Sequence, residues 1–254
     1  MATKPVTLTN LTLNLRRYVA DQDAGGHALW REVIEPRTVL ADQLAIIICD
    51  MWDNHWSRGA TERVTEMAPR MNDIIGVARA KGVHIIHAPS DTLDFYAGTP
   101  ARLRAITAPD VAPPPHLEHV DPPLPIDDSD EGSDTGEARP YHAWSRQHQA
   151  LEIDPDVDAI SADGREVHNL LRGWGVTQTL IMGVHTNMCV LGRSFAIKQM
   201  VRWGVPIALV RDLTDAMYNP AMSPYVNHAD GTALVIGYIE RFWCPSVVSA
   251  DLVW

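Results

Sequence analysis

The chain has 254 residues, which is long enough for one large domain or two small ones with a sizeable core. Apolar residues make up 46% and charged residues 21%, as in ordinary globular proteins. The formal net charge of −11 argues against nucleic acid or an anionic membrane as a partner. The three cysteines show no zinc spacing, and the chain contains neither a signal-peptide core nor an apolar run of membrane length. These features predict a cytoplasmic protein.

The first regular pattern follows a weakly patterned start. Residues 1–43 alternate only weakly between apolar and polar positions, which predicts a β-rich N-terminal extension to a domain at 44–254. The continuous apolar run from Leu44 to Cys49 is typical of a strand that is buried on both faces. Helical spacing follows from about Glu62 to Lys81, and a second strand is expected at Val83–Ile86.

Residues 97–150 break this alternation of strands and helices. They contain many prolines, little periodicity and an acidic run, so we expect a long insertion that is ordered or partly ordered. The acidic run lacks the glycine and glutamate offsets of a calcium loop, which favours a solvated loop.

The second half returns to the earlier pattern, with a strand at 176–184, a helix beginning near Cys189 and a strand at 205–210. The whole sequence therefore predicts an α/β fold. We expect a doubly wound, mostly parallel sheet of about six strands with helices on both faces.

The segment from Gly183 to Val190, GVHTNMCV, joins a predicted strand to a predicted helix. A thiol at the start of a helix meets unpaired backbone N–H groups and the positive end of the helix dipole. Both favour the thiolate, which is the nucleophilic form. The alternative use of a free cysteine such as Cys189 is as a small buried apolar residue.

In a doubly wound sheet, ligands bind beyond the carboxyl ends of the strands, near the point where the strand order reverses. The side chains that follow the predicted strands are therefore expected to converge on one rim. They are Asp50, Trp52, Asp53, His55 and Trp56 after the first strand, His87, Ser90, Asp91, Phe95 and Tyr96 after the second, His185, Thr186, Asn187 and Cys189 after the third, and Asp212 and Asp215 after the fourth.

Asp50 and the Gly183–Val190 pattern resemble the isochorismatase-like cysteine hydrolases, a superfamily that includes nicotinamidases and N-carbamoylsarcosine amidases. The resemblance covers roughly residues 44–96 and 150–240. It implies that Cys189 attacks a carbonyl carbon, while Asp50 takes the thiol proton and returns it to the leaving amine.

The resemblance also implies an unusual peptide at the turn. The Val184–His185 peptide matches the position where the family carries a cis bond. The amides of His185 and Cys189 would then form an oxyanion hole.

The third catalytic residue of the family, a lysine, has no counterpart at the expected position near residues 156–164. Lys198 lies nine residues beyond Cys189, on the opposite face of a continuous helix. Arg146 and His148 lie just upstream of the vacant position and are the candidate replacements. Lys4 could reach the site only through the extension or a neighbouring subunit.

No cofactor or metal is expected. The Asp-x-His element that holds metal in nicotinamidases is absent after the second strand, which disfavours a nicotinamidase. His55, His87, Asp53 and Asp91 could build a different metal site, although no spacing is diagnostic. The expected substrate pocket consists of Trp52, Asp53, His55, Trp56, His87, Phe95 and Tyr96.

The leading hypothesis is a cysteine hydrolase that cleaves an amide-like C–N bond of a small molecule through a thioester. The missing lysine favours an alternative, a non-catalytic member of the fold that binds a ligand or serves in assembly. Metal-assisted hydrolysis by the rim histidines is another alternative. Isochorismate-type cleavage is disfavoured, because relatives with that chemistry lack the cysteine. Since the family commonly assembles, we expect a homo-oligomer.

Overall fold

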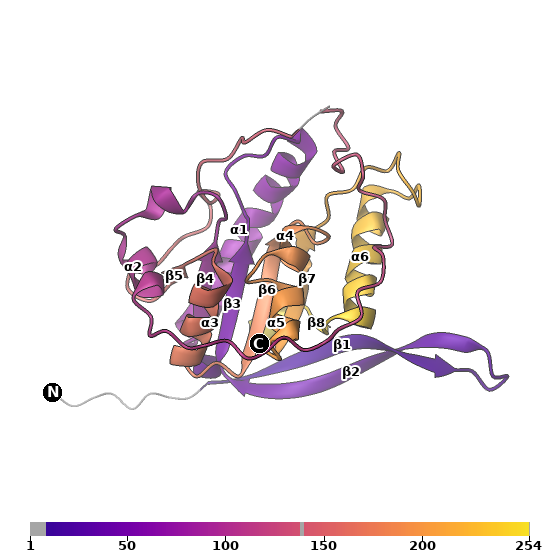
Figure 1. Cartoon of the computed structure of the whole chain (residues 1–254), viewed down its shortest axis with the longest axis horizontal. Coiled ribbons are helices and arrows are strands. Elements are labelled where there is room, and N and C mark those ends of the chain that lie inside the picture. The colour runs from indigo at the N-terminus through magenta and orange to yellow at the C-terminus, as the bar shows by residue number, and fades with distance from the viewer. Residues whose placement is uncertain (1–8, 138–139, 254) are drawn as a thin grey trace.

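The computed structural model describes residues 9–137 and 140–253, so the first eight residues of the predicted extension, with Lys4, lie outside the described part. One sheet of eight strands organises the chain, in the order β2-β1-β8-β7-β6-β3-β4-β5 (Figure 1). The strands are β1 Asn10–Gln22, β2 Ala28–Leu40, β3 Leu44–Cys49, β4 His84–Ala88, β5 Ala159–Ile160, β6 Gln178–Val184, β7 Ile207–Asp215 and β8 Ser246–Val247.

Helices connect and cover the strands. The α-helices are α1 Arg58–Ala80, α2 Pro100–Ile106, α3 Gly164–Gly173, α4 Cys189–Gly192, α5 Ile197–Arg202 and α6 His228–Phe242, and short 3₁₀ helices occupy Ala41–Gln43, Leu93–Tyr96 and Ser249–Leu252. Within the described residues, none of the helices combines the length and the apolar character needed to cross a membrane.

The α/β class and the mostly parallel sheet are confirmed. Strands β8, β7, β6, β3, β4 and β5 pair in parallel, and the chain moves from β3 first to one side and then to the other. The predicted strand count of about six was wrong, because the β1–β2 hairpin of the extension joins the same sheet. Arg16 of β1 pairs there with Ser246 of β8.

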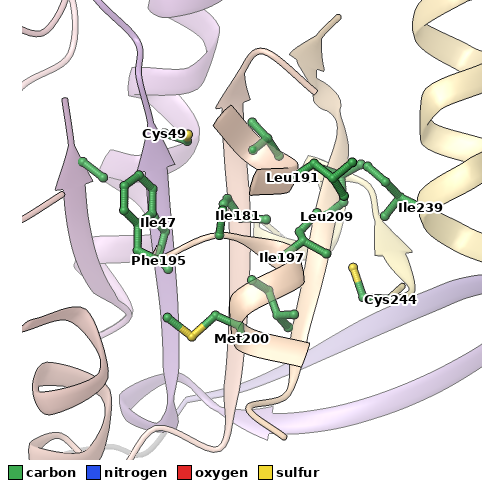
Figure 2. Close-up of a cluster of buried hydrophobic side chains, with 14 of the residues drawn as sticks. Ile47, Cys49, Ile181, Leu191, Phe195, Ile197, Met200, Leu209, Ile239 and Cys244 are labelled. Atoms are coloured by element: carbon green, nitrogen blue, oxygen red, sulfur yellow. The ribbon is translucent and has the colours of Figure 1, made fainter. Parts of the chain in front are cut away.

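Both faces of the sheet are covered, as predicted. Ile46 and Ile48 of β3 face α1, where they pack with residues such as Met71. Ile47 and Cys49 point to the opposite face, which α3, α4, α5 and α6 cover. Figure 2 shows this second cluster, in which Phe195 lies against Ile47. The alternation of side chains along a strand explains why a continuous apolar run was needed here.

The hairpin of β1 and β2 extends beyond the helices as a twisted two-stranded arm (Figure 1). Leu11, Leu13 and Leu15 are buried at its base, which accounts for the weak alternation in the sequence. Most of β2 is exposed, including Ile34. Packing against the body therefore involves mainly β1.

The region predicted as an insertion carries helix α2, and the described residues between Thr107 and Asp158 form no further helix or strand. The chain passes along α6 toward the carboxyl ends of the strands (Figure 1). Side-chain contacts hold it there: Asp134 pairs with Arg63 of α1 at 2.8 Å, and Asp128 accepts a hydrogen bond from Asn187.

The helix expected after Cys189 is broken into two short pieces, α4 and α5. Ser194 lies in the break, and its hydroxyl accepts a hydrogen bond from the Gly164 amide at 2.9 Å. A Cβ at Gly164 would overlap the Ser194 carbonyl, so these two segments of the backbone approach as closely as a glycine allows. Arg193, the residue after α4, precedes the break, and its amide donates to the Cys189 carbonyl at 3.0 Å.

Candidate active site at the carboxyl edge of the sheet

The site lies where the direction of chain progression reverses. β3 has β4 on one side and β6 on the other, and all three strands end at the same edge of the sheet. Asp50 follows β3, Ser90 follows β4 and His185 follows β6. This is the crevice that doubly wound sheets use for ligands.

Asp50 is fully buried, with 0% of its surface exposed, and has a φ of 46°. Its Oδ1 accepts the Ser90 amide at 2.7 Å, and its Oδ2 accepts Nε of Arg193 at 3.1 Å. Burial raises the pKa of Asp50, while Arg193 and Ser90 oppose this shift. The carboxylate is therefore held by a cation and a backbone amide and has no exposed surface in the resting structure.

Cys189 is the first residue of α4 and lies beside Asp50. Burial raises the pKa of Cys189 to about 12, and the Asp50 charge adds to the increase; Arg193 and the His185 amide lower the pKa. This raised pKa opposes the thiolate that a position at the start of a helix favours. α4 has only four residues, so it provides little of the helix dipole on which that expectation relied. The resting pair is a neutral thiol next to a carboxylate.

The turn before Cys189 has the backbone that the family resemblance implied. The Val184–His185 peptide is cis. The His185 carbonyl accepts the amides of Met188 and Val190 at 3.0 and 3.1 Å. These bonds fold the turn so that the His185 amide points at the thiol of Cys189.

Arg193 is the functional residue that the sequence reasoning missed. Its guanidinium bridges two carboxylates: Nε contacts Asp50, and Nη2 lies 3.1 Å from Oδ2 of Asp91. The available signal was its spacing of four from Cys189, which puts two helical residues on the same face.

The predicted replacements for the lysine form other contacts. Arg146 lies 4.0 Å from Asp53 and covers the ring of Phe95. The His148 ring accepts the amide of Ala150. Lys198 binds Asp121 at 2.7 Å. Among the described residues, no recorded hydrogen bond or ion pair joins these three basic side chains to Asp50 or Cys189.

Part of the predicted pocket forms an aromatic cluster next to the turn. Trp52 stacks on Trp144 of the inserted segment with ring centroids 4.3 Å apart, and His55 packs against Trp56 and His185. Burial lowers the pKa of His55 to about 4 and that of His185 to about 3. Both rings are therefore neutral at physiological pH.

The other predicted pocket residues are placed differently. His87 is fully buried, with its ring nitrogens 2.9 Å from Gln147 and 3.0 Å from Asp158. Tyr96 is also buried, and its hydroxyl accepts the Gln147 amide. Asp53 binds Ser145, and Phe95 is exposed. Asp53, His87, Phe95 and Tyr96, four of the seven predicted pocket residues, therefore lie outside the aromatic cluster next to the turn.

A cavity of about 680 Å³ opens beside Arg193. Ser90 and Arg193 contact Asp50 and also line this cavity, which therefore reaches the surroundings of the carboxylate. A second pocket of about 10 Å³ touches Asp50, Trp52, His55 and His185. The larger cavity is lined by Ser90, Asp91, Leu93, Asp94, Ala162, Asp163, Gly192, Arg193 and Ser194.

The residues considered for a metal do not gather. Over 9–137 and 140–253, no group of three or more His, Cys, Asp or Glu side chains has the arrangement of a metal site. His87 is bound by Gln147 and Asp158, and Asp91 is bound by Arg193.

Comparison with known proteins places this geometry in a family. The sequence model of the isochorismatase domain matches residues 44–223, well over half of the chain. A cysteine hydrolase from Pseudomonas syringae pv. phaseolicola 1448A is similar in structure, with a TM-score of 0.52 and 17% identity over 85% of this chain and 92% of the other.

Two further solved structures are more distant. An isochorismatase family protein from Burkholderia thailandensis has a TM-score of 0.46 and 14% identity over 83% of this chain and 93% of its own. The N-carbamoylsarcosine amidase of Thermoplasma acidophilum has a TM-score of 0.43 and 14% identity over 81% and 95%. Curated protein sequences yield no match. On the extent of the domain match, this chain belongs to the isochorismatase family of hydrolases.

Proposed function

We propose that this protein is a cysteine hydrolase that cleaves an amide-like C–N bond of a small molecule through a thioester. The observation that carries the proposal is the placement of the Cys189 thiol beside the buried Asp50 carboxylate. A thiol that rests in its neutral form needs a base at hand, and Asp50 is the group positioned to accept its proton.

In the acylation half, the Cys189 sulfur attacks the substrate carbonyl carbon while its proton moves to Asp50. The tetrahedral intermediate then collapses as the C–N bond breaks, and Asp50 returns the proton to the departing nitrogen. An amine or ammonia leaves, and the acyl group stays on sulfur as a thioester.

In the deacylation half, Asp50 takes a proton from water as the water oxygen attacks the thioester carbon. The carbon–sulfur bond breaks, the thiolate regains the proton from Asp50, and the acid product leaves. The amides of His185 and Cys189 are proposed to bind the carbonyl oxygen in both tetrahedral intermediates. The His185 amide already faces the sulfur in the resting site.

The raised pKa of Asp50 suits this exchange, because a carboxylate whose pKa lies above its ordinary value is a stronger base. We propose that the cavity beside Arg193 admits the substrate. This proposal differs from the pocket expected from the sequence, which consisted of Trp52 and the nearby aromatic side chains.

The test is a screen for ammonia or amine release from small amides, ureas and carbamoyl compounds, with Cys189→Ala run in parallel. Cys244 is a buried cysteine elsewhere in the core, so Cys244→Ala is the matched control. Release by the wild type and by Cys244→Ala, together with loss in Cys189→Ala, is the expected result. Equal release by Cys189→Ala and wild type would refute the proposal.

A further inference from the structure

The Asp50–Cys189 pair requires a positive charge, because one proton shared between a thiol and a carboxylate leaves one negative charge on the pair. Asp50 is 0% exposed, so water does not solvate this charge. A buried charge without a partner is unstable and is neutralised by taking up a proton. A protonated Asp50 could not accept the proton of Cys189.

Arg193 is the cation in contact with this pair. Its Nε lies 3.1 Å from Asp50, and its charge lowers the pKa of the Cys189 thiol. Its side chain is 32% exposed and lines the large cavity, so it lies between the buried carboxylate and the opening. Arginine stays protonated at all relevant pH values and cannot pass a proton, which restricts it to an electrostatic role.

Asp91 holds a second nitrogen of the same guanidinium. Its Oδ2 lies 3.1 Å from Nη2 of Arg193, and its side chain is 51% exposed at the cavity rim. The two carboxylates accept from neighbouring nitrogens of the guanidinium, Nε and Nη2, and together they restrict its orientation. Asp91 also partly neutralises the charge that Arg193 offers to Asp50.

We propose that Arg193, positioned by Asp91, supplies the charge that keeps the Asp50–Cys189 pair singly ionised, in place of the lysine of the family. The inference deepens the proposed function and rests on it. Arg193 follows Cys189 in the sequence at the end of α4, whereas the lysine was expected before Cys189, near residues 156–164.

The remaining titratable neighbour does not supply this charge. Cys49 directly precedes Asp50. Burial, and to a smaller extent the Asp50 charge, raise the pKa of the Cys49 thiol, so this thiol is neutral. Among the described residues, the charged groups that act on Asp50, on Cys189 or on the guanidinium are Arg193 and Asp91, besides the pair itself.

The experiment measures the rate of alkylation of Cys189 by iodoacetamide against pH, with the modified peptide quantified by mass spectrometry. It requires no substrate, so its outcome is independent of the hydrolysis screen. In Arg193→Gln the acid limb of the profile should move up by at least about one pH unit, which makes alkylation about tenfold slower below that limb.

Two further variants keep the test informative if Arg193→Gln does not fold. Arg193→Lys retains the charge and should restore the profile toward that of the wild type. Asp91→Asn keeps an oxygen that can accept from Nη2 of Arg193 but removes a negative charge next to it, so it should move the limb to lower pH. Asparagine tolerates the φ of 62° at this position, so the substitution should change the charge without straining the backbone.

The control is Asp21→Asn, which removes an aspartate paired with Arg31 at 2.5 Å on the hairpin. Its profile should match that of the wild type. A wild-type profile in folded Arg193→Gln, or a shift of Asp91→Asn in the same direction as Arg193→Gln, would overturn the proposal. Circular dichroism establishes which variants are folded.

Discussion

Gly183 of β6 lies directly against the main-chain carbonyl of Cys49 in β3, its partner in the parallel ladder. Its φ is 110°, a value that residues with a Cβ rarely adopt, and a Cβ would overlap the Cys49 oxygen. This close approach occurs one residue before Asp50 and two before His185. The glycine therefore brings together the ends of the two strands that carry Asp50 and His185.

We expect Gly183→Ala to lower the free energy of unfolding by at least about 3 kcal/mol, because both the backbone and its neighbour must move. Urea denaturation measures the loss. Gly76→Ala is the matched control, since Gly76 lies inside α1 with open space around its Cα. There the substitution should stabilise the protein by about 0.5–1 kcal/mol. Similar effects at both positions would contradict this account.

The sequence predicted the elements whose signal is local. The run from Leu44 to Cys49 matches β3, because a strand buried on both faces needs an apolar residue at every position. The turn from Gly183 to Cys189 was equally predictable. The ring of His87 was assigned to the pocket although it is buried with two polar partners, since a residue's position near a strand end does not tell which face its side chain takes.

The break after α4 could not be predicted, because it depends on a tertiary contact. Residues 189–200 have helical periodicity, but Ser194 meets Gly164, which is distant in sequence. Arg193 lies just before that contact and closes the last turn of α4, with its amide donating to the Cys189 carbonyl at 3.0 Å. The path of the inserted segment could not be predicted either. Its contacts, such as that of Asp134 with Arg63, join residues that are distant in sequence, and no local sequence pattern indicates them.

Arg63 of α1 offers a test of how the inserted segment is held. It binds Asp215 at the end of β7 and Asp134 of the insertion, both at 2.8 Å, and its side chain is largely buried. Removing one partner of a buried ion pair costs about 3–5 kcal/mol. We expect Arg63→Ala to lie near the lower end of this range, because His228 still binds Asp215.

Arg58 is the control on the same helix. It pairs with Glu62 at 2.8 Å, but both side chains are exposed, at 65% and 60%. Exposed pairs at this spacing contribute about 0.3–0.5 kcal/mol. Arg58→Ala should therefore change the midpoint of urea unfolding only slightly, and a loss as large as that of Arg63→Ala would show that burial is not the cause.

Stability should decrease as the pH falls from 6.5 toward 4. The pKa of His55 is lowered to about 4 and that of His185 to about 3 by burial, so the unfolded chain binds protons in this window that the folded protein does not. Each such proton changes the unfolding free energy by about 1.4 kcal/mol per pH unit.

The neighbouring ion pair titrates outside this window. Burial lowers the pKa of His228, but Asp215 raises it by a larger amount, so the pKa is raised overall. The contribution of His228 to the stability of the fold is therefore complete below about pH 6.5 and is lost at higher pH. The pKa of Asp215 is lowered by its partners against the effect of burial, so its contribution is lost only at acidic pH. Urea unfolding at several pH values measures the slope, which His55→Gln should reduce. An unchanged slope in that variant would contradict the assignment.

Asp50→Asn separates the base from the nucleophile. The amide cannot accept the thiol proton, so the rate of hydrolysis should fall by about 10²–10⁴-fold. The alkylation of Cys189 should instead become faster at neutral pH. Burial is the largest cause of the raised pKa of the thiol and the Asp50 charge is the second, so removing that charge lowers the pKa. Hydrolysis is followed by product release, and alkylation by mass spectrometry of the Cys189 peptide. If both rates fell together, Asp50 would be needed for the structure of the site rather than for proton transfer, whereas opposite changes are the signature of a general base.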